Sequence, residues 1–177
     1  EATVPLFEEA VRAILARDPN GLIVDLRNNP GGFLDGALRV SAEWIPRGGT
    51  VVVQRLQGNK NEELRAQGLA RFDGMPTVVL INPGTASGAE IVAGALQDHK
   101  KATLVGEKTF GKGSVQDWEQ LQGGSSVKIT IAEWLTPTRR KINGEGVAPD
   151  FEVKLDREDY DVDADPQLQK AVELLLK

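Results

Sequence analysis

The chain has 177 residues, of which 40% are hydrophobic and 27% charged, a composition typical of a single globular domain. The net charge of -5 argues against a nucleic-acid-binding protein, because such a protein needs a basic face to neutralise phosphates. The absence of cysteine excludes disulfides, thiolate nucleophiles and Cys-ligated zinc, and a single histidine, His99, excludes a His-rich metal site within the chain. Hydrolytic chemistry here would rest on hydroxyl, amine and carboxylate groups, with no cofactor.

Helical and strand patterns alternate along the chain. In chain order, the pattern predicts a helix over 6–17, a strand over 22–26, a helix over 34–44, strands over 50–55 and 77–81, a helix over 87–98, strands over 102–105 and 126–135, and a helix over 167–176. The polar residues 62–70 favour either a helix or a surface segment, and the acidic run 156–165 is typical of a solvated spacer. The alternation predicts an α/β fold with a mostly parallel sheet, helical crossovers and antiparallel strands late in the chain.

Three loops rich in Gly, Pro and Asn follow predicted parallel strands, at 27–32, 82–87 and 106–113. Parallel strands place such loops at one edge of the sheet, where α/β proteins hold their sites. Small residues are also what any strand-to-helix turn needs, so each loop alone indicates little. The second loop carries Ser87 and the third carries Lys112. These two residues favour a shared functional site over three turns that are merely rich in small residues.

Ser87 stands where a predicted helix begins, and serine is among the best N-cap residues, so a purely structural role is the simpler interpretation. The alternative is a nucleophile whose exposed hydroxyl has unpaired backbone N–H groups beside it. The N–H of Gly88 and one from the pair Gly31–Gly32 would then face a developing oxyanion. A G-x-S-x-G pattern is not present, because Thr85 stands at the first glycine position.

A serine nucleophile needs a base. His99 is a poor candidate because it lies about 18 Å from Ser87 along the predicted helix, and we expect it to face solvent. Lys112 is better placed, in a loop after the neighbouring strand. A lysine accepts a proton only in its neutral form, which burial beside Phe110 and the absence of a nearby carboxylate would favour. A solvated surface lysine is the alternative for Lys112.

Residues 106–112 also match the first seven positions of a phosphate-binding P-loop. The eighth position should be Ser or Thr and is Gly113, and the following residues, 114–124, do not form a convincing helical pattern. Nucleotide binding is therefore a weak alternative.

Three segments together resemble the carboxyl-terminal processing peptidases, which are serine endopeptidases with a Ser–Lys catalytic pair. They are Gly21–Gly32, Thr85–Ile91 and Thr109–Gln116, with a weaker match at Gly146–Asp150. The resemblance covers nearly the whole chain and implies a ClpP/crotonase-like core.

The resemblance further implies a role for each site residue. Ser87 would be the nucleophile, Lys112 the general base and Gln116 the residue that positions the lysine, and the backbone N–H groups of Gly32 and Gly88 would form the oxyanion hole. Lys112 and Gln116 would share one face if their segment were helical. From the residues alone, Gln116 is better explained as an exposed polar residue.

Members of this family usually carry a PDZ domain ahead of the region matched here, so residues 1–177 are expected to be the catalytic domain without it. The implied partners are protein or peptide substrates with exposed C-termini, in an extracytoplasmic compartment such as the bacterial periplasm. A non-catalytic module that binds an apolar ligand or a peptide on the same fold is the rival interpretation.

Overall fold

A computed structural model describes residues 3–156, 159 and 164–177. In chain order the elements are α1 (Thr3–Leu15), β1 (Leu22–Asp25), α2 (Leu34–Ser41), β2 (Thr50–Leu56), the 3-10 turn Gln57–Asn59, β3 (Asn61–Arg65), β4 (Thr77–Ile81), α3 (Gly88–Asp98), β5 (Thr103–Gly106), β6 (Ser114–Gln120), β7 (Ser126–Leu135), β8 (Phe151–Glu152) and α5 (Pro166–Leu175). Each helix and strand that the sequence predicts is present, with ends that differ by three residues at most. No helix in this part of the chain is long and apolar enough to cross a membrane.

One sheet is entirely parallel, with strand order β1-β4-β5-β8. The central strand β4 is buried at every position, because it pairs with β1 and β5 and is covered on both faces. This accounts for its uninterrupted apolar sequence, which is typical of parallel strands. The α/β class is confirmed, and the loops after β1, β4 and β5 leave the sheet at one edge, as predicted.

The second sheet is antiparallel, with strand order β3-β2-β7-β6. It rejects the helical alternative for residues 62–70 and corrects one further expectation. Residues 62–70 are not helical, because Asn61–Arg65 pair with β2 as strand β3. Antiparallel pairing is also not confined to the end of the chain, since β2 joins β7 rather than the parallel sheet. In the described part of the chain, the antiparallel sheet thus has as many strands as the parallel one.

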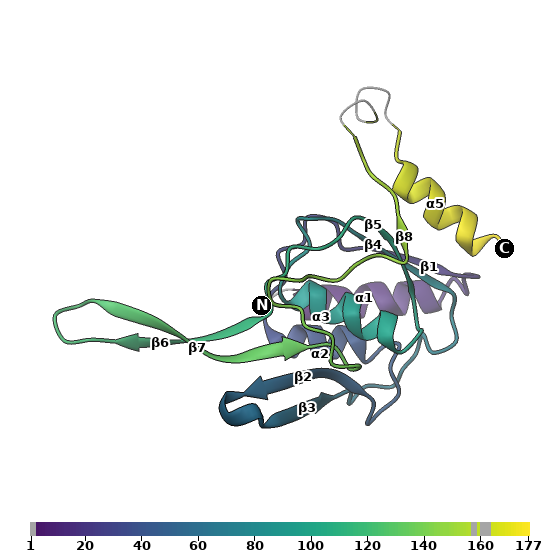
Figure 1. The fold of residues 1–177 in the computed structure, drawn as a ribbon. Coiled ribbons are helices and arrows are strands. Elements are labelled where there is room, and N and C mark those ends of the chain that lie inside the picture. The colour runs from purple at the N-terminus through teal and green to yellow at the C-terminus, as the bar shows by residue number, and fades with distance from the viewer. Residues whose placement is uncertain (1–2, 157–158, 160–163) are drawn as a thin grey trace.

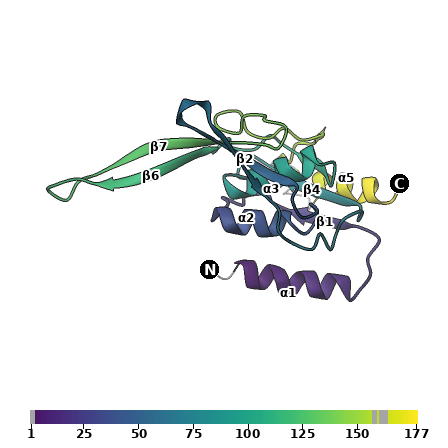
Figure 2. The same ribbon diagram turned by 90° about the horizontal axis from the view of Figure 1, so that it is seen from below.

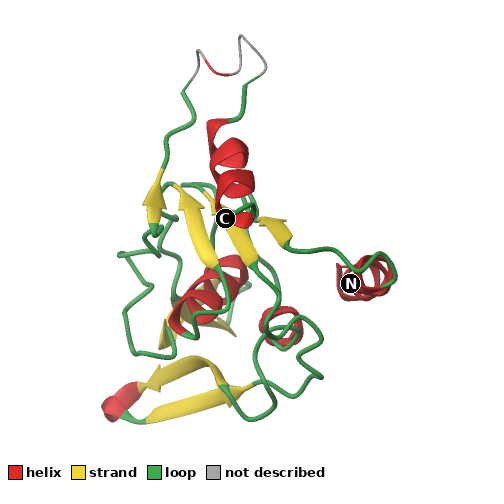
Figure 3. Cartoon of the chain, turned by 90° about the vertical axis from the view of Figure 1, so that its right-hand side faces the viewer, coloured by secondary structure: helices red, strands yellow, loops and turns green. Residues whose placement is uncertain are grey.

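The helices fill the space around the two sheets. Helix α5 packs on one face of the parallel sheet against β4, and α3 packs on its other face against β5 and also against β2 of the second sheet (Figure 3). Helix α2 packs beside α3, and α1 lies beyond α2 at the edge of the molecule (Figure 2). Helix α3, which begins directly after Ser87, is therefore held between two sheets.

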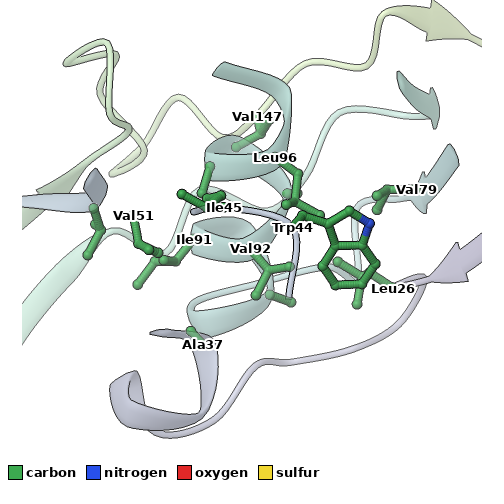
Figure 4. Packing of buried hydrophobic residues seen from close by; sticks show 14 of the residues in the cluster. Leu26, Ala37, Trp44, Ile45, Val51, Val79, Ile91, Val92, Leu96 and Val147 are labelled. Atoms are coloured by element: carbon green, nitrogen blue, oxygen red, sulfur yellow. The ribbon is translucent and has the colours of Figure 1, made fainter. Parts of the chain in front are cut away.

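The main core lies around α3 (Figure 4). Ile91, Val92 and Leu96 project from α3 into a cluster that includes Trp44, whose indole N–H donates to the hydroxyl of Thr77 at 2.9 Å. Burying apolar side chains of this size contributes roughly 1.5–3 kcal/mol each relative to exposure. The helix that carries the candidate nucleophile is thus fixed by packing along its length.

Strands β6 and β7 continue beyond the body of the molecule as a long two-stranded hairpin (Figure 1). Residues 126–131 of β7 are all exposed, whereas Trp134 and Leu135 at its far end are buried against the body. Two strands on their own are marginally stable in water, so the hairpin depends on its attachment at the base.

Candidate active site

Ser87 lies in the turn between β4 and α3 with φ 55° and ψ -122°. These angles are neither helical nor extended, and a non-glycine residue adopts a positive φ only where its surroundings impose it. Ser87 is the N-cap of α3, as the structural interpretation expected. It is also strained in the way that hydrolases hold a nucleophile on a sharp strand-to-helix turn, although the glycine pattern of those enzymes is absent.

The strain at Ser87 is held by a buried carboxylate. Glu90 lies one turn into α3, is fully buried, and accepts a hydrogen bond from the backbone N–H of Ser87 at 2.9 Å. The same oxygen, Oε2, accepts from the N–H of Lys112 at 2.8 Å. The other oxygen accepts from Gly111 N at 2.7 Å and from the hydroxyl of Thr109. Glu90 therefore fastens the serine turn to the lysine loop.

Gly31, Gly32 and Gly88 form a close backbone contact beside Ser87. Gly31 has φ 85°, and a Cβ there would lie 2.6 Å from Gly88 N and 2.5 Å from Ala86 O, so only glycine fits. A Cβ on Gly88 would lie 3.2 Å from Gly32 N. Within the described residues, the N–H groups of Gly32 and Gly88 donate to no backbone or side-chain acceptor. Two unpaired donors thus lie side by side next to the serine, one of them at the start of a helix.

The loop after β1 is tied to the serine turn by several short bonds. Ala86 N donates to Asn29 O at 2.9 Å, and Asn28 N donates to Asn82 Oδ1 at 2.8 Å. The hydroxyl of Thr85, which is fully buried, donates to Leu26 O at 2.7 Å. The first two of the three predicted loops are therefore in direct contact.

Lys112 is brought to this site by its backbone, but its side chain is exposed. In the part of the chain that the structure describes, no hydrogen bond joins its amine to the hydroxyl of Ser87. The expectation that Phe110 buries the lysine is wrong, because Phe110 is 69% exposed. The reason is local: Phe110 N donates to Thr85 O at 3.0 Å, and this holds the backbone against the serine turn while the ring points outward. The expectation that no carboxylate lies nearby is wrong too, because the buried Glu90 accepts from the backbone N–H of Lys112.

Gln116 lies in β6, paired with Thr130 of β7, and it is exposed. The condition that Lys112 and Gln116 share a helical face is not met, since the segment after Gly113 is extended. The register of β6 against β7 shifts between Val115 and Gln116, so the strand is irregular where it leaves the lysine loop.

His99 takes no part in the site. It is the C-cap of α3, at the end of the helix opposite Ser87, as the sequence indicated. It is half-buried rather than solvent-facing, because its Nε2 lies 2.7 Å from Thr50 O at the start of β2.

The structure argues against a P-loop at residues 106–113. This loop runs into strand β6, so no helix N-terminus follows it to face a phosphate. Its N–H groups at Gly111 and Lys112 already donate to Glu90. A buried carboxylate thus stands where a phosphate would have to bind.

A pocket of about 760 Å³ opens beside the Gly32–Gly88 contact. It lies between α2, the first turn of α1 and the start of α3, and most of its wall is apolar. The wall includes Val4, Leu26, Ala37, Ala89 and Val92. This pocket provides room for one apolar side chain or a short peptide segment next to the serine.

Glu90 and Thr109 are site residues that the sequence analysis missed. The spacing Ser87-x-x-Glu90 is a capping-box pattern, which was an available signal for the bond to Ser87 N. The bonds from Gly111 and Lys112 had no such signal, because they join residues 21 and 22 positions away.

Fold and site together define a class: a mixed α/β core in which a strained serine follows a parallel strand and begins a buried helix. Comparison with known proteins identifies the family. The model of peptidase family S41 matches residues 2–153, and the chain belongs to this family. The recognition of this family from sequence motifs is confirmed.

Individual relatives agree. The chain is 41% identical over 169 residues to a carboxyl-terminal-processing protease of Synechocystis, covering 94% of this chain and 39% of that protein. It is 38% identical over 160 residues to the carboxy-terminal processing protease CtpA of Bacillus subtilis, covering 90% of this chain and 34% of that protein. A solved photosystem II D1 C-terminal processing protease superposes with a TM-score of 0.81 at 35% identity, covering 87% of this chain and 40% of that one. The chain thus spans between about one third and two fifths of the length of these relatives.

Proposed function

We propose that this domain hydrolyses peptide bonds near protein C-termini, with Ser87 as nucleophile and Lys112 as general base. The observation that carries the proposal is that the backbone N–H groups of Ser87 and Lys112 donate to the same oxygen of Glu90, at 2.9 and 2.8 Å. Residues 25 positions apart are thereby held at one point, with a serine hydroxyl and a primary amine as their side chains.

In the proposed reaction, the neutral amine of Lys112 accepts the proton of the Ser87 hydroxyl as its oxygen attacks the peptide carbonyl. The oxyanion of the tetrahedral intermediate accepts hydrogen bonds from the N–H groups of Gly32 and Gly88. The Lys112 ammonium then protonates the leaving amine, which leaves an acyl-enzyme on Ser87. Lys112 next takes a proton from water as the water oxygen attacks the acyl carbon. The Ser87–acyl bond then breaks, and the Lys112 ammonium returns the proton to the serine oxygen, which releases the new carboxyl end and restores the serine.

Substrate recognition follows from the pocket beside Gly32. Its mostly apolar wall favours an apolar side chain on the residue whose carbonyl is attacked. Gln116 would orient the Lys112 amine, since a neutral amide does so without stabilising the charged form as a carboxylate would. A preceding PDZ domain and an extracytoplasmic location remain predictions.

Labelling with an active-site-directed fluorophosphonate tests the nucleophile. We expect the parent chain to be labelled at Ser87, and Ser87→Ala to lose both labelling and cleavage of an unstructured peptide with an apolar C-terminus. Ser126→Ala, at an exposed serine of β7, is the matched control and should behave as the parent. Peptide cleavage by Ser87→Ala at the parent rate would refute the assignment.

A non-catalytic binding module is the second candidate function. It is favoured by the side chain of Lys112, which is exposed and makes no hydrogen bond or ion pair with any residue that the structure describes. It predicts that the parent chain binds an apolar C-terminal peptide, measured by calorimetry, while Ser87 stays unlabelled. Labelling of Ser87 together with cleavage of the same peptide would reject it.

A further inference from the structure

Arg27 stands out among the charged residues near the site. It lies in the loop that leads from β1 to Gly32, yet its side chain is only 15% exposed. Its guanidinium donates in two directions, and neither is toward the serine. An arginine that is nearly buried between other elements commonly holds those elements together, because its planar donors fix geometry as well as supplying charge.

On one side the guanidinium clamps the end of β1. Nε lies 3.0 Å from Asp25 Oδ1, and Nη2 lies 2.7 Å from Asp25 Oδ2. Burial alone would raise the pKa of Asp25, but the hydrogen bonds and charge of Arg27 outweigh it and hold that pKa below its usual value. The pair is therefore ionised across the neutral range, and the clamp is charge-assisted.

On the other side, Nη1 reaches the start of α5. It donates to Asp165 Oδ1 at 3.0 Å and to Gln167 Oε1 at 3.1 Å. Asp165 is the N-cap of α5 and accepts from Leu168 N at 2.8 Å. Gln167 is 1% exposed, and its amide donates to Val153 O just after β8. Arg27 thus joins the first strand of the parallel sheet to the last helix.

The backbone that follows Arg27 leads directly into the candidate site. Asn28 N donates to Asn82 Oδ1, and Asn29 O accepts from Ala86 N, next to Ser87. The Cα of Gly31 lies so close to the backbone of Gly88 that even a Cβ on Gly31 would collide with Gly88 N. A shift of the Arg27 backbone would therefore displace the N–H group of Gly32 relative to that of Gly88, the two groups that the proposed mechanism assigns to the oxyanion.

We propose that Arg27 is a positioning residue through which the N-terminus of α5, at Asp165 and Gln167, holds the loop 27–32 in place as a brace. Because this loop carries the N–H of Gly32, catalysis would depend on the docking of this C-terminal helix. The inference rests on the proposed function for its effect on rate, but the brace itself is a property of the fold. Lysine cannot replace Arg27, since one ammonium cannot reach Asp25, Asp165 and Gln167 in the same geometry.

The test compares Arg27→Lys and Asp165→Asn with a control, Arg140→Lys. Asparagine caps helices as well as aspartate, so Asp165→Asn removes the charge of the brace while keeping the cap of α5. Arg140 is a matched control because it also donates to an aspartate and a glutamine, Asp98 and Gln97, but at the end of α3 opposite Ser87. The readouts are the fluorophosphonate labelling rate at Ser87, kcat and KM on a peptide, melting temperature and local amide hydrogen exchange.

We expect Arg27→Lys to slow labelling and to lower kcat about tenfold or more, because the N–H donor of Gly32 moves. KM should stay within about twofold of the parent value, because the pocket between α1, α2 and α3 remains. Asp165→Asn should do the same to a smaller extent. Both variants should speed exchange of residues 28–32 and 84–88 beyond any global change. Arg140→Lys should leave labelling and exchange of these segments unchanged, even where it lowers the melting temperature.

Hydrogen exchange separates the two hypotheses. If the parent chain is never labelled, the proposed function fails, while exchange of residues 28–32 still decides the brace. Unchanged exchange of these residues in Arg27→Lys overturns the inference. The inference is also overturned if Arg27→Lys and the control Arg140→Lys lower the melting temperature equally and lower the labelling rate equally.

Discussion

The serine turn and the β6–β7 hairpin both lead to the candidate site, but they are built in opposite ways. The turn around Ser87 is held by Glu90, by the loop after β1 and by the packed helix α3. The hairpin leaves the body directly after Lys112, and most of its residues are exposed. The proposed nucleophile and the two N–H groups beside it are therefore preorganised. The lysine side chain and Gln116 lie on the part of the site that is least constrained.

This difference indicates that the oxyanion donors and the lysine side chain need different degrees of preorganisation. Oxyanion donors must be in place before the reaction, because their contribution depends on not having to reorganise. A base on an exposed side chain needs only to rotate toward the serine, since its backbone is already fixed by Glu90. The four predictions below test each side of this comparison, from the largest expected effect to the smallest.

Lys112→Met should lower the rate of peptide cleavage on the order of 10³-fold, because it removes the proposed general base while keeping the length of the side chain. The melting temperature should stay at the parent value, since the side chain is exposed. Lys108→Met, at an exposed lysine of the same loop, is the control and should retain the parent rate. Equal losses in the two variants would remove Lys112 from its assigned role.

Glu90→Gln should destabilise the chain by about 2–3 kcal/mol, because it turns an amide donor toward backbone N–H donors in a buried position. Labelling of Ser87 should fall with it, since both the serine turn and the lysine loop lose their shared acceptor. Urea unfolding measures the first effect and fluorophosphonate labelling the second. Glu63→Gln, at an ion pair on the edge strand β3, should change stability by less than about 0.5 kcal/mol.

Gln116→Ala should lower the cleavage rate about tenfold if this residue orients the lysine amine. Ile129 lies in the same hairpin and is 44% exposed. The control Ile129→Thr should therefore leave both the cleavage rate and the stability near the parent values. Steady-state kinetics of the two variants tests whether the hairpin contributes through Gln116 or not at all. A parent rate in Gln116→Ala would leave the hairpin without a catalytic role.

Asp98→Asn tests the end of α3 opposite Ser87 and should affect stability alone. Burial would raise the pKa of Asp98, but hydrogen bonds from Thr136, Thr138 and Arg140 lower it overall. A carboxylate of this kind stabilises the fold above its unfolded pKa, near 3.8, and the contribution is lost as the pH falls through the lower folded value.

The parent should therefore lose stability on acidification below about pH 4, while Asp98→Asn should be less stable by about 1 kcal/mol at pH 7 and show a flatter acid limb. Thermal unfolding from pH 7 down to the acid limit measures both effects. A parent-like acid limb in the variant would contradict the assigned role of Asp98, and a fall in Ser87 labelling at pH 7 would contradict the separation of the two ends of α3.

Local patterns were sufficient to predict most of the fold. The apolar runs at β1 and β4 and the helical spacing after Ser87 identified the parallel units, because burial on both faces leaves a signature in adjacent residues. Strand β3 was missed because its residues, Asn61–Arg65, are polar and take their structure from pairing with β2. Edge strands that face solvent carry little periodic signal.

For the candidate site, the sequence by itself determined which chemistry was available. Without cysteine and with one histidine, a hydrolase had to use hydroxyl, amine or carboxylate groups. The resemblance to a known family then selected Ser87 and Lys112, along with Gly32, Gly88 and Gln116. Only the tertiary structure decided how they are held. The bonds from Gly111 and Lys112 to Glu90, the outward ring of Phe110 and the contacts of Arg27 with α5 all arise between segments far apart in the chain. Such contacts leave no local pattern, because a buried hydrogen bond depends on where the backbone passes rather than on neighbouring residues.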